Sequence, residues 1–405
     1  MEAVVERKEN CYGCTACSQI CPHSAINMVK DGEGFLYSEI DQKACIDCKL
    51  CRKVCPYYSN TASTNECAQR YYAVQHRDRD VVAKSTSGGI FTALSDYILN
   101  RHGVVYGVAY EEGFVIAHNR AEDASARDRF CRSKYVQSNM KSVMSSILTD
   151  LCEGRRVMFT GTPCQVAGVR NYVLQKHKNL NGLFLCDFIC HGVASPAVWR
   201  QYVDFLEERY KISLTTYHFR SKDSGWHANL PKIVMGDTNV SNDFQKKQSF
   251  FLLYATCYIN RLCCYQCKYA SYQRQSDITI GDFWNIGKIA PEMDDDTGTS
   301  QVLINTKRGQ EWFEGCRDSI KLLECTKEDV WQPHLEYPNE LPRGRIKFWE
   351  DFQSLPFGQV IQKYGKGSLV SKCKSIGVPI VKKLGLYTFA GKAYRWLFVR
   401  KGQKS

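Results

Sequence analysis

The residues in this sequence that are best suited to chemistry are its cysteines, which number 21 in 405 residues. Two stretches, CYGCTACSQICP (11–22) and CIDCKLCRKVCP (45–56), each hold four cysteines at the spacing Cys-x2-Cys-x2-Cys-x3-Cys, followed by proline. Thiolates are soft ligands that stabilise iron–sulfide cores. Because the spacing is short, one loop can supply three corners of a cubane cluster. The eight residues are Cys11, Cys14, Cys17, Cys21, Cys45, Cys48, Cys51 and Cys55.

This double run is the signature of a bacterial-type ferredoxin domain with two [4Fe–4S] clusters. The first three cysteines of each run hold one cluster, and the fourth crosses over to the other. Cys55 therefore completes the first cluster and Cys21 the second. Zinc knuckles or free thiols are the alternative, which two complete copies with proline at the same offset disfavour. A module of this kind carries single electrons and has no substrate site, so it does not define the function.

A second group of cysteines lies more than a hundred residues further along the chain. Cys164 stands in the turn GTPCQ, Cys190 ends the apolar run LFLCDFIC, and Cys264 and Cys267 form a Cys-x-x-Cys pair. Because loops at strand ends can converge in space, these four are predicted to hold a third cubane. A zinc site is the alternative that the spacing leaves open.

Neighbouring cysteines compete for two of these positions. Cys263 competes with Cys264, and Cys186 competes with Cys190. Cys264 is favoured because it stands at the required spacing from Cys267. The other cysteines outside the two N-terminal runs are expected to be small buried hydrophobic residues, which is the default for this residue type.

Two turns rich in small residues suggest a cofactor with phosphate groups. KSTSGGIFTAL (84–94) places serine, threonine and glycine at the start of a predicted helix, where exposed N–H groups and the helix dipole favour an anion. FTGTPCQVAG (159–168) does the same at a strand-to-helix turn, the usual ligand position in α/β sheets. An ordinary helix cap explains either turn alone, whereas both together, next to further cysteines, favour a bound flavin.

Hydrophobic runs and helix signals define the elements that position these residues. The stretches 71–76, 103–110, 155–163, 182–190, 277–284 and 300–306 are predicted strands, and 88–100, 164–177, 195–210 and 307–320 are predicted helices. We therefore predict an α+β protein. Its parts are a ferredoxin domain (1–60), a polar linker (61–70), a larger mixed α/β flavin-binding domain (71–340) and a basic C-terminal extension (341–405).

The formal charge of +12 comes almost entirely from the C-terminal tail. No acidic residue follows Asp351, and residues 352–405 carry 11 lysines and arginines. The tail is either a terminal helix packed on the body or an interfacial segment on anionic lipid. Nothing accompanies it that indicates nucleic-acid binding. No signal peptide or membrane-length apolar run is visible, so a cytoplasmic protein is expected, peripheral at the inner face of the membrane if the lipid hypothesis holds.

Several motifs together resemble one known family. STSGGIFTAL, GTPCQVAGVR, CHGVASP, FRSKDSGW and DITIGDFW, in this order behind the double cysteine run, are similar to the beta subunit of coenzyme F420 hydrogenase/dehydrogenase over residues 1–335. The resemblance implies a domain that binds FAD or FMN beside its own [4Fe–4S] cluster. It also implies electron transfer between ferredoxin-type clusters and a hydride carrier, either coenzyme F420 or another small-molecule acceptor.

The resemblance also assigns individual residues. The residues implied to line the flavin are Ser87, Gly88, Gly89, Thr160, Gly161, Thr162 and Gln165. Arg274, Asp277 and Asp282 are implied to flank the cofactor site, with a buried ion pair as the structural alternative. His191 is a candidate proton relay and Lys134 a candidate partner of an anionic ligand, although a structural role is the usual one for a lone histidine near a turn.

Two functions follow as hypotheses. The first is an iron–sulfur flavoprotein oxidoreductase that exchanges electrons with ferredoxin or another redox protein and with a small-molecule acceptor. The second is a non-catalytic electron-transfer subunit that serves a partner enzyme, with a link to cell-surface polysaccharide biosynthesis as one version. The sequence contains no Gly-x-Gly-x-x-Gly unit for a nicotinamide dinucleotide, and it does not identify the acceptor.

Overall fold

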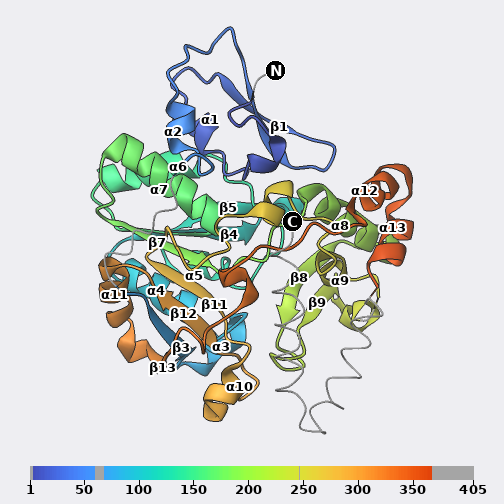
Figure 1. The fold of residues 1–405 in the computed structure, drawn as a ribbon. Helices are drawn as coiled ribbons and strands as arrows, with labels where there is room; N and C mark the ends of the chain where they lie inside the picture. The colour runs from blue at the N-terminus through green and yellow to red at the C-terminus, as the bar shows by residue number, and fades with distance from the viewer. Residues whose placement is uncertain (1–2, 60–67, 246, 367–405) are drawn as a thin grey trace, which may run out of the picture.

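The computed structural model describes residues 3–59, 68–245 and 247–366 of the chain, which form three packed parts (Figure 1). A small N-terminal module lies on a large α/β sheet domain, and a unit rich in aromatic residues flanks that domain. The predicted order of a ferredoxin-like domain followed by a larger α/β domain is therefore confirmed. The basic tail after residue 366, with both hypotheses about it, lies outside the described residues. No described helix has the length and apolar character needed to cross a bilayer.

The N-terminal module repeats its local structure as its sequence repeats. Helices α1 (Ala16–Ile20) and α2 (Leu50–Val54) each end at the fourth cysteine of a run. Each also begins after a residue in the left-handed conformation, Thr15 with φ 62° and Lys49 with φ 58°. Between the two helices, β1 (Ile26–Lys30) and β2 (Leu36–Ile40) form an antiparallel hairpin. The two cysteine loops thus have equivalent geometry.

An eight-stranded mixed sheet organises the larger domain, in the order β13-β3-β12-β11-β7-β6-β4-β5. Its four central strands run parallel: β4 (Val104–Tyr110), β6 (Val157–Gly161), β7 (Leu183–Phe188) and β11 (Ile278–Asp282). The outer strands are antiparallel: β5 (Ile116–Ala121), β12 (Ser300–Ile304), β3 (Arg70–His76) and β13 (Ile320–Cys325). The two strands that the apolar pattern did not predict, β5 and β13, are the edge strands, whose exposed side leaves them partly polar.

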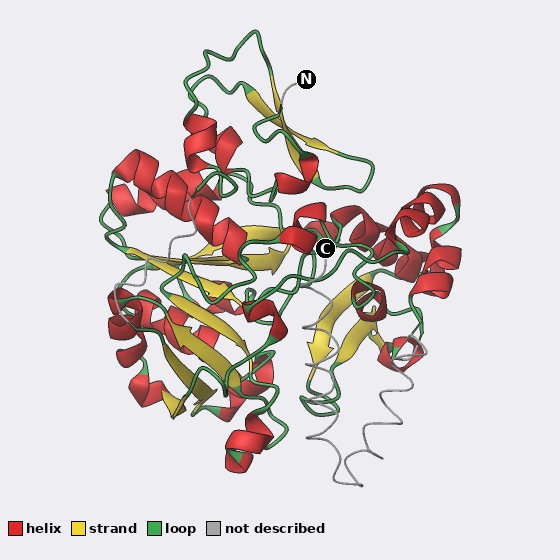
Figure 2. Ribbon diagram, viewed as in Figure 1, coloured by secondary structure: helices red, strands yellow, loops and turns green. Residues whose placement is uncertain are grey.

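Helices cover both faces of this sheet (Figure 2). On one face lie α6 (Val143–Cys152) and α7 (Pro163–His177), and on the other α4 (Ile90–Leu99) and α11 (Lys307–Glu314). Side chains alternate between the two cores along β6. Phe159 belongs to the core beneath α6 and α7, whereas Met158 belongs to the core beneath α4. The N-terminal module packs on the α6–α7 side, against α7.

The long connection between β7 and β11 forms most of the aromatic unit. It contains α8 (Pro196–Tyr210), the hairpin β8 (Leu214–Ser221) and β9 (Leu230–Met235), and α9 (Phe250–Tyr254). As predicted, Ser195 caps α8 ahead of Pro196. Helices α12 (Arg345–Ser354) and α13 (Phe357–Tyr364) complete this unit. Their side chains Phe348 and Val360 lie in the same buried cluster as Trp199, so the start of the predicted C-terminal extension is part of a folded core.

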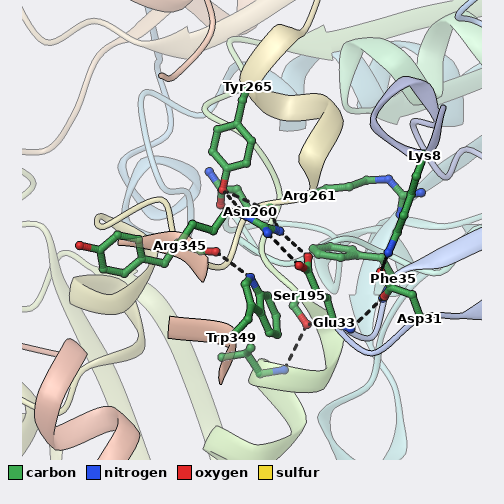
Figure 3. Close-up of polar contacts among 12 residues, drawn as sticks. Lys8, Asp31, Glu33, Phe35, Ser195, Asn260, Arg261, Tyr265, Arg345 and Trp349 are labelled. Carbon is green, nitrogen blue, oxygen red and sulfur yellow. Dashed lines mark hydrogen bonds and ion pairs between the residues drawn. The ribbon is translucent and has the colours of Figure 1, made fainter. Parts of the chain in front are cut away.

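The tip of the β1–β2 hairpin docks the N-terminal module on the aromatic unit (Figure 3). The Glu33 carboxylate accepts two hydrogen bonds from the Arg345 guanidinium, one of them at 2.7 Å. The Ser195 hydroxyl donates to the Glu33 carbonyl. A Cβ on Gly34 would lie 2.3 Å from the Ala197 side chain, so the hairpin can approach α8 only because this residue is glycine. The module is therefore held by a specific interface in addition to its chain connection.

Replacing Arg345 with methionine is expected to release the hairpin. The ion pair is buried, with side-chain exposures of 8% for Arg345 and 16% for Glu33, and removing one partner of such a pair costs roughly 3 kcal/mol. Amide hydrogen exchange in residues 31–36 should therefore accelerate. Lys347→Met on the same helix is the matched control, because its ion pairs are exposed and worth well under about 1 kcal/mol. Equal exchange in the two variants would refute the proposed docking role.

Candidate functional site

The four cysteines of the second group line one small cavity of about 30 Å³. Cys164 lies in the first turn of α7 directly after β6, and Cys190 follows β7. Cys264 and Cys267 come from the 3-10 segment η4 (Leu262–Gln266) and its end. The structure therefore brings together all four residues that the sequence singled out. Tyr12 of the N-terminal module lines the same cavity.

Backbone hydrogen bonds place the η4 segment next to Cys190. The Arg261 N–H donates to the Val193 carbonyl at 3.1 Å, and the Ser195 N–H donates to the Ile259 carbonyl at 2.9 Å. These bonds tie the chain that follows β7 to the chain that precedes η4. Residues more than sixty positions apart in sequence are thereby fixed as neighbours.

The structure separates the competing cysteines. Cys186 is fully buried in the core beneath α4, on the opposite face of the sheet from α7, so Cys190 is the one at the cavity. Cys263 does line the cavity, but its thiol donates a hydrogen bond to Cys264. That bond lowers the pKa of Cys264, whereas burial raises the pKa of Cys263. Cys264 is thus the better thiolate.

The cysteines of the N-terminal module show the predicted crossover. Burial first, and then the thiols of Cys55, Cys17 and Cys11, raise the pKa of Cys14. Burial, with Cys48 and Cys21 as the contributing thiols, raises the pKa of Cys51. The fourth cysteine of each run therefore lies with the first three of the other. Within the described ranges, no three His, Cys, Asp or Glu side chains converge as the ligands of one metal ion would.

A second, much larger cavity of about 440 Å³ adjoins the cysteine cavity. Most of the predicted cofactor and catalytic residues line it: Ser87, Gly89, Thr160, Gly161, Thr162, Gln165, Asp282, His191 and Lys134. Five residues line both cavities: Thr162, Gln165, His191, Gly192 and Val193. The two cavities therefore share one wall, a single layer of residues thick.

The two glycine-rich turns contribute to this wall in different ways. Gly88 packs against the sheet, since a Cβ there would lie 2.2 Å from the Val74 carbonyl oxygen, and it does not line the cavity. Gly89, with φ 88°, begins α4 without a side-chain cap. At the start of α7, Thr162 and Gln165 form a reciprocal capping box. The ordinary helix cap thus describes the second turn, while the first leaves its helix start open.

Three predicted charged residues have structural partners. Lys134 donates to the backbone carbonyls of Arg129, Cys131 and Arg132 at 3.1–3.3 Å, and burial lowers its pKa to about 8. Its ammonium therefore holds a loop together. Arg274 lies outside both cavity walls, buried 3.8 Å from Asp187. Asp277 accepts two hydrogen bonds from Arg308 at one oxygen and one from the Leu185 N–H at the other.

His191 stands on the shared wall as a neutral imidazole. Burial, followed by the nearby His334 and Arg220, lowers its pKa to about 3. The rings of His191 and His334 are in edge contact with centroids 4.0 Å apart. At neutral pH this side chain can donate or accept a hydrogen bond between the cavities, but it does not hold a second proton.

Arg220, in the FRSKDSGW motif, is a cavity residue that sequence reasoning did not single out. It is 5% exposed and donates from Nη1 to Asp282, while its Nε and Nη2 have no hydrogen-bond partner among the described residues. Its guanidinium lies 4.7 Å from the ring centre of Trp284. Asn229, also on the wall, has a buried side-chain oxygen that no described residue pairs with. A buried guanidinium with two free donors fits an anionic or carbonyl-rich ligand.

Lys222 of the same motif fixes the first glycine-rich turn. Its ammonium donates to the Ser87 carbonyl at 2.7 Å and to the Val82 carbonyl at the end of α3 (Arg79–Lys84). Burial lowers its pKa to about 7. The motif therefore supplies one cation to the cavity and one to the turn beside it, a pairing that its charged letters alone did not reveal.

Comparisons with known proteins identify two regions of the chain. Residues 154–329 match the family model for the C terminus of the coenzyme F420 hydrogenase/dehydrogenase beta subunit, and residues 10–59 match a 4Fe-4S dicluster domain. No curated protein sequence is significantly similar to the chain. A structure of the F420-reducing [NiFe] hydrogenase complex from Methanosarcina barkeri, derivatised with xenon, contains a chain with 18% identity and a TM-score of 0.43. That alignment covers 65% of this chain and 84% of the other.

The buried His118 behind the large cavity is expected to make stability fall with acid. It contacts the Ser138 hydroxyl at 3.0 Å and the Thr160 carbonyl at 3.1 Å, and burial lowers its pKa to about 4. Between pH 6.5 and 4 the unfolded chain binds a proton that the folded chain does not. The free energy of unfolding should therefore drop by about 3 kcal/mol as pH falls through this window.

Urea unfolding at pH 7 and pH 5 under anaerobic conditions measures this effect. His118→Gln should flatten the pH dependence, leaving the contribution of His191, which has the same sign because its pKa is also lowered. An unchanged slope in the variant would show that His118 is not the group that titrates.

Proposed function

Because the chain belongs to the coenzyme F420 hydrogenase/dehydrogenase beta subunit family and carries a 4Fe-4S dicluster domain ahead of the family region, we propose that it is an iron–sulfur flavoprotein oxidoreductase. It exchanges electrons between its N-terminal clusters and a small-molecule acceptor through a bound flavin. The observation that carries this proposal is the wall shared by the cysteine cavity and the large cavity. A cluster in one and an organic cofactor in the other would be immediate neighbours.

The residues present fit a third [4Fe–4S] cluster. Cys164, Cys190, Cys264 and Cys267 supply four soft ligands around one cavity. Such a cluster transfers one electron at a time, at a potential set by net charge and by hydrogen bonds to the sulfurs. The chain contributes a dry site, because Tyr12 and Tyr269 close the cavity from both sides with ring centres 5.5 Å apart. The zinc alternative lacks support from the ligand arrangement, which surrounds a cavity.

The large cavity fits a flavin in size and in chemistry. Its volume of about 440 Å³ lies within the range of small-molecule sites. A bound flavin exchanges two electrons with a hydride carrier and single electrons with a cluster. Arg220 and Asn229 would offer two donors and one acceptor to the polar edge of the ring system. Lys222 holds the small-residue turn around Ser87 in place for the remainder of the cofactor, as FAD or FMN.

The cavity opening favours an enzyme over a subunit that only conducts electrons. Phe188 and Trp284 line the cavity and are 36% and 39% exposed, so an acceptor can reach the interior from solvent between aromatic surfaces. We infer that the acceptor is coenzyme F420 or another flat hydride carrier. Ferredoxin or another redox protein would supply or remove electrons at the N-terminal module.

Cofactor content and turnover test the proposed function directly. Anaerobically purified protein should contain about 12 iron atoms per chain, as three [4Fe–4S] clusters require, and release one flavin that mass spectrometry identifies. The purified chain alone, with a reduced artificial donor, should then reduce F420 or a nicotinamide. A flavin-free chain that turns over only after a partner enzyme is added would support the non-catalytic subunit instead.

Serine substitutions should distinguish the ligands of the third cluster. Cys264→Ser is expected to lose about four iron atoms per chain, because it removes one of four thiolates. Cys263→Ser, at the adjacent position on the same cavity, should keep its iron, and Cys186→Ser on the other face of the sheet serves as a second control. Iron loss in Cys263→Ser and not in Cys264→Ser would reverse the assignment.

A further inference from the structure

A fully buried arginine lies at the junction between the N-terminal module and the third cysteine group (Figure 3). Arg261 donates from Nε to the Cys11 carbonyl at 2.7 Å and from Nη2 to the Leu36 carbonyl at 2.8 Å. Its Nη1 donates to the Gln137 side chain at 3.0 Å. The remaining contact is with the sulfur of Cys11, at 3.4 Å from Nη2. Every nitrogen of the guanidinium is therefore engaged across the junction.

This charge has no carboxylate to balance it within the described part of the chain. Arg261 forms no ion pair with an aspartate or glutamate there, and its partners are carbonyls, an amide, a sulfur and the ring of Tyr37 at 4.1 Å. A buried guanidinium without counter-charge is strongly unfavourable. The groups near it that can carry negative charge are thiols: Cys11 on the module side, and Cys263 and Cys264 on the other. Iron-bound thiolates would supply the missing charge.

A second cation of the same segment lies at the rim of the junction. Lys268 donates to the carbonyls of Tyr57 and Ser59 in the N-terminal module, at 3.0 and 2.6 Å. Its ammonium also interacts electrostatically with Cys55 and Cys267, one from each predicted cluster site. Arg261 and Lys268 thus flank both sites from one short stretch of chain.

The two cysteine groups meet across a single helical turn. A Cβ on Gly168 of α7 would lie 3.0 Å from the Cys14 sulfur, so the glycine lets this cysteine of the first cluster rest on the helix. Cys164, of the third group, stands four residues earlier on α7, a rise of about 6 Å. One positive charge in this junction therefore acts on both sites at close range.

We propose that Arg261 is a positioning residue that sets the reduction potential of the two inner iron–sulfur sites, the first cluster and the third. Reduction adds one electron and one negative charge to a cluster, with no bond made or broken, and a fixed cation beside its sulfurs stabilises that state. The outer second cluster has no buried cation beside it among the described residues, and its ligand Cys48 is exposed. Electrons from a redox partner would therefore collect at the inner sites, next to the large cavity.

Charge-changing variants of the holoprotein test this proposal without any acceptor. Reductive titration with dithionite, followed by electron paramagnetic resonance, gives the potential of each cluster. Arg261→Gln should make the inner sites at least tenfold harder to reduce relative to the second cluster, which is about 59 mV for one electron. Arg261→Lys keeps the charge and should stay close to the unmodified protein, although it loses the forked hydrogen bonds.

A second site guards against a variant that fails to hold iron. Lys268→Gln removes a charge from the rim without cutting into the core, and should shift the inner potentials in the same direction by a smaller factor. Lys347→Gln, whose partners are Glu350 and Asp351, is the neutral control. Inner potentials that stay unchanged in an iron-replete Arg261→Gln, or in Lys268→Gln, would overturn the proposal.

This inference rests on the proposed function for the third site alone. The first cluster and its contact with Arg261 belong to the N-terminal module, so its potential can be followed even in protein that carries no flavin and shows no turnover. A shift of the first cluster in flavin-free protein would uphold the role of Arg261 while the flavin hypothesis failed.

Discussion

The structure depends on one constraint, which is that four thiols from three distant segments must meet at one edge of a parallel sheet. Strands β6 and β7 run parallel in register, with Gly161 opposite Asp187, so the chain leaves both strands at the same edge. Cys164 and Cys190 follow within a few residues. The third segment, which carries Cys264 and Cys267, is brought to that edge by backbone bonds to residues 193–195. A sheet of different order would separate these cysteines.

The N-terminal module completes this site as part of its wall. Tyr12 lies between two cysteines of the first run and also lines the cavity of the third group. Tyr269 meets it from the other side and donates its hydroxyl to the Pro56 carbonyl of the module. Burial raises the pKa of both phenols, so both stay uncharged at the junction. The module thus excludes water from the third site while placing its own first cluster beside it.

The sequence predicted the central strands, the helices that follow them and the convergence of four cysteines, because each depends on a local pattern or on parallel-sheet topology. It did not predict the edge strand β5 or the hairpin of β8 and β9, where polar residues interrupt the apolar alternation. Helices α12 and α13 were assigned to an extension because their basic letters conceal one strongly apolar face. Pattern alone does not show which face a core will need.

Buried charges were the least predictable feature of the site. Arg274 was expected beside the cofactor and lies near Asp187, while Arg220, four residues before the glycine-containing turn at Ser224–Trp226, has free donors in the cavity. A single sequence lists cations without saying which carboxylate each one meets, since the partners are separated by tens of residues.

The same property separates the functional cations from the structural ones. A buried cation that the protein itself satisfies, such as Lys134 among three carbonyls, stabilises the fold and has nothing left to bind. Arg220 and Arg261 are satisfied only in part, one by a single carboxylate and the other by neutral groups and a sulfur. Because burying a charge without compensation is costly, each implies a negatively charged or electron-accepting group next to it. One lies at the large cavity and the other between the cysteine groups, so the two mark the ends of the third site, through which electrons would pass.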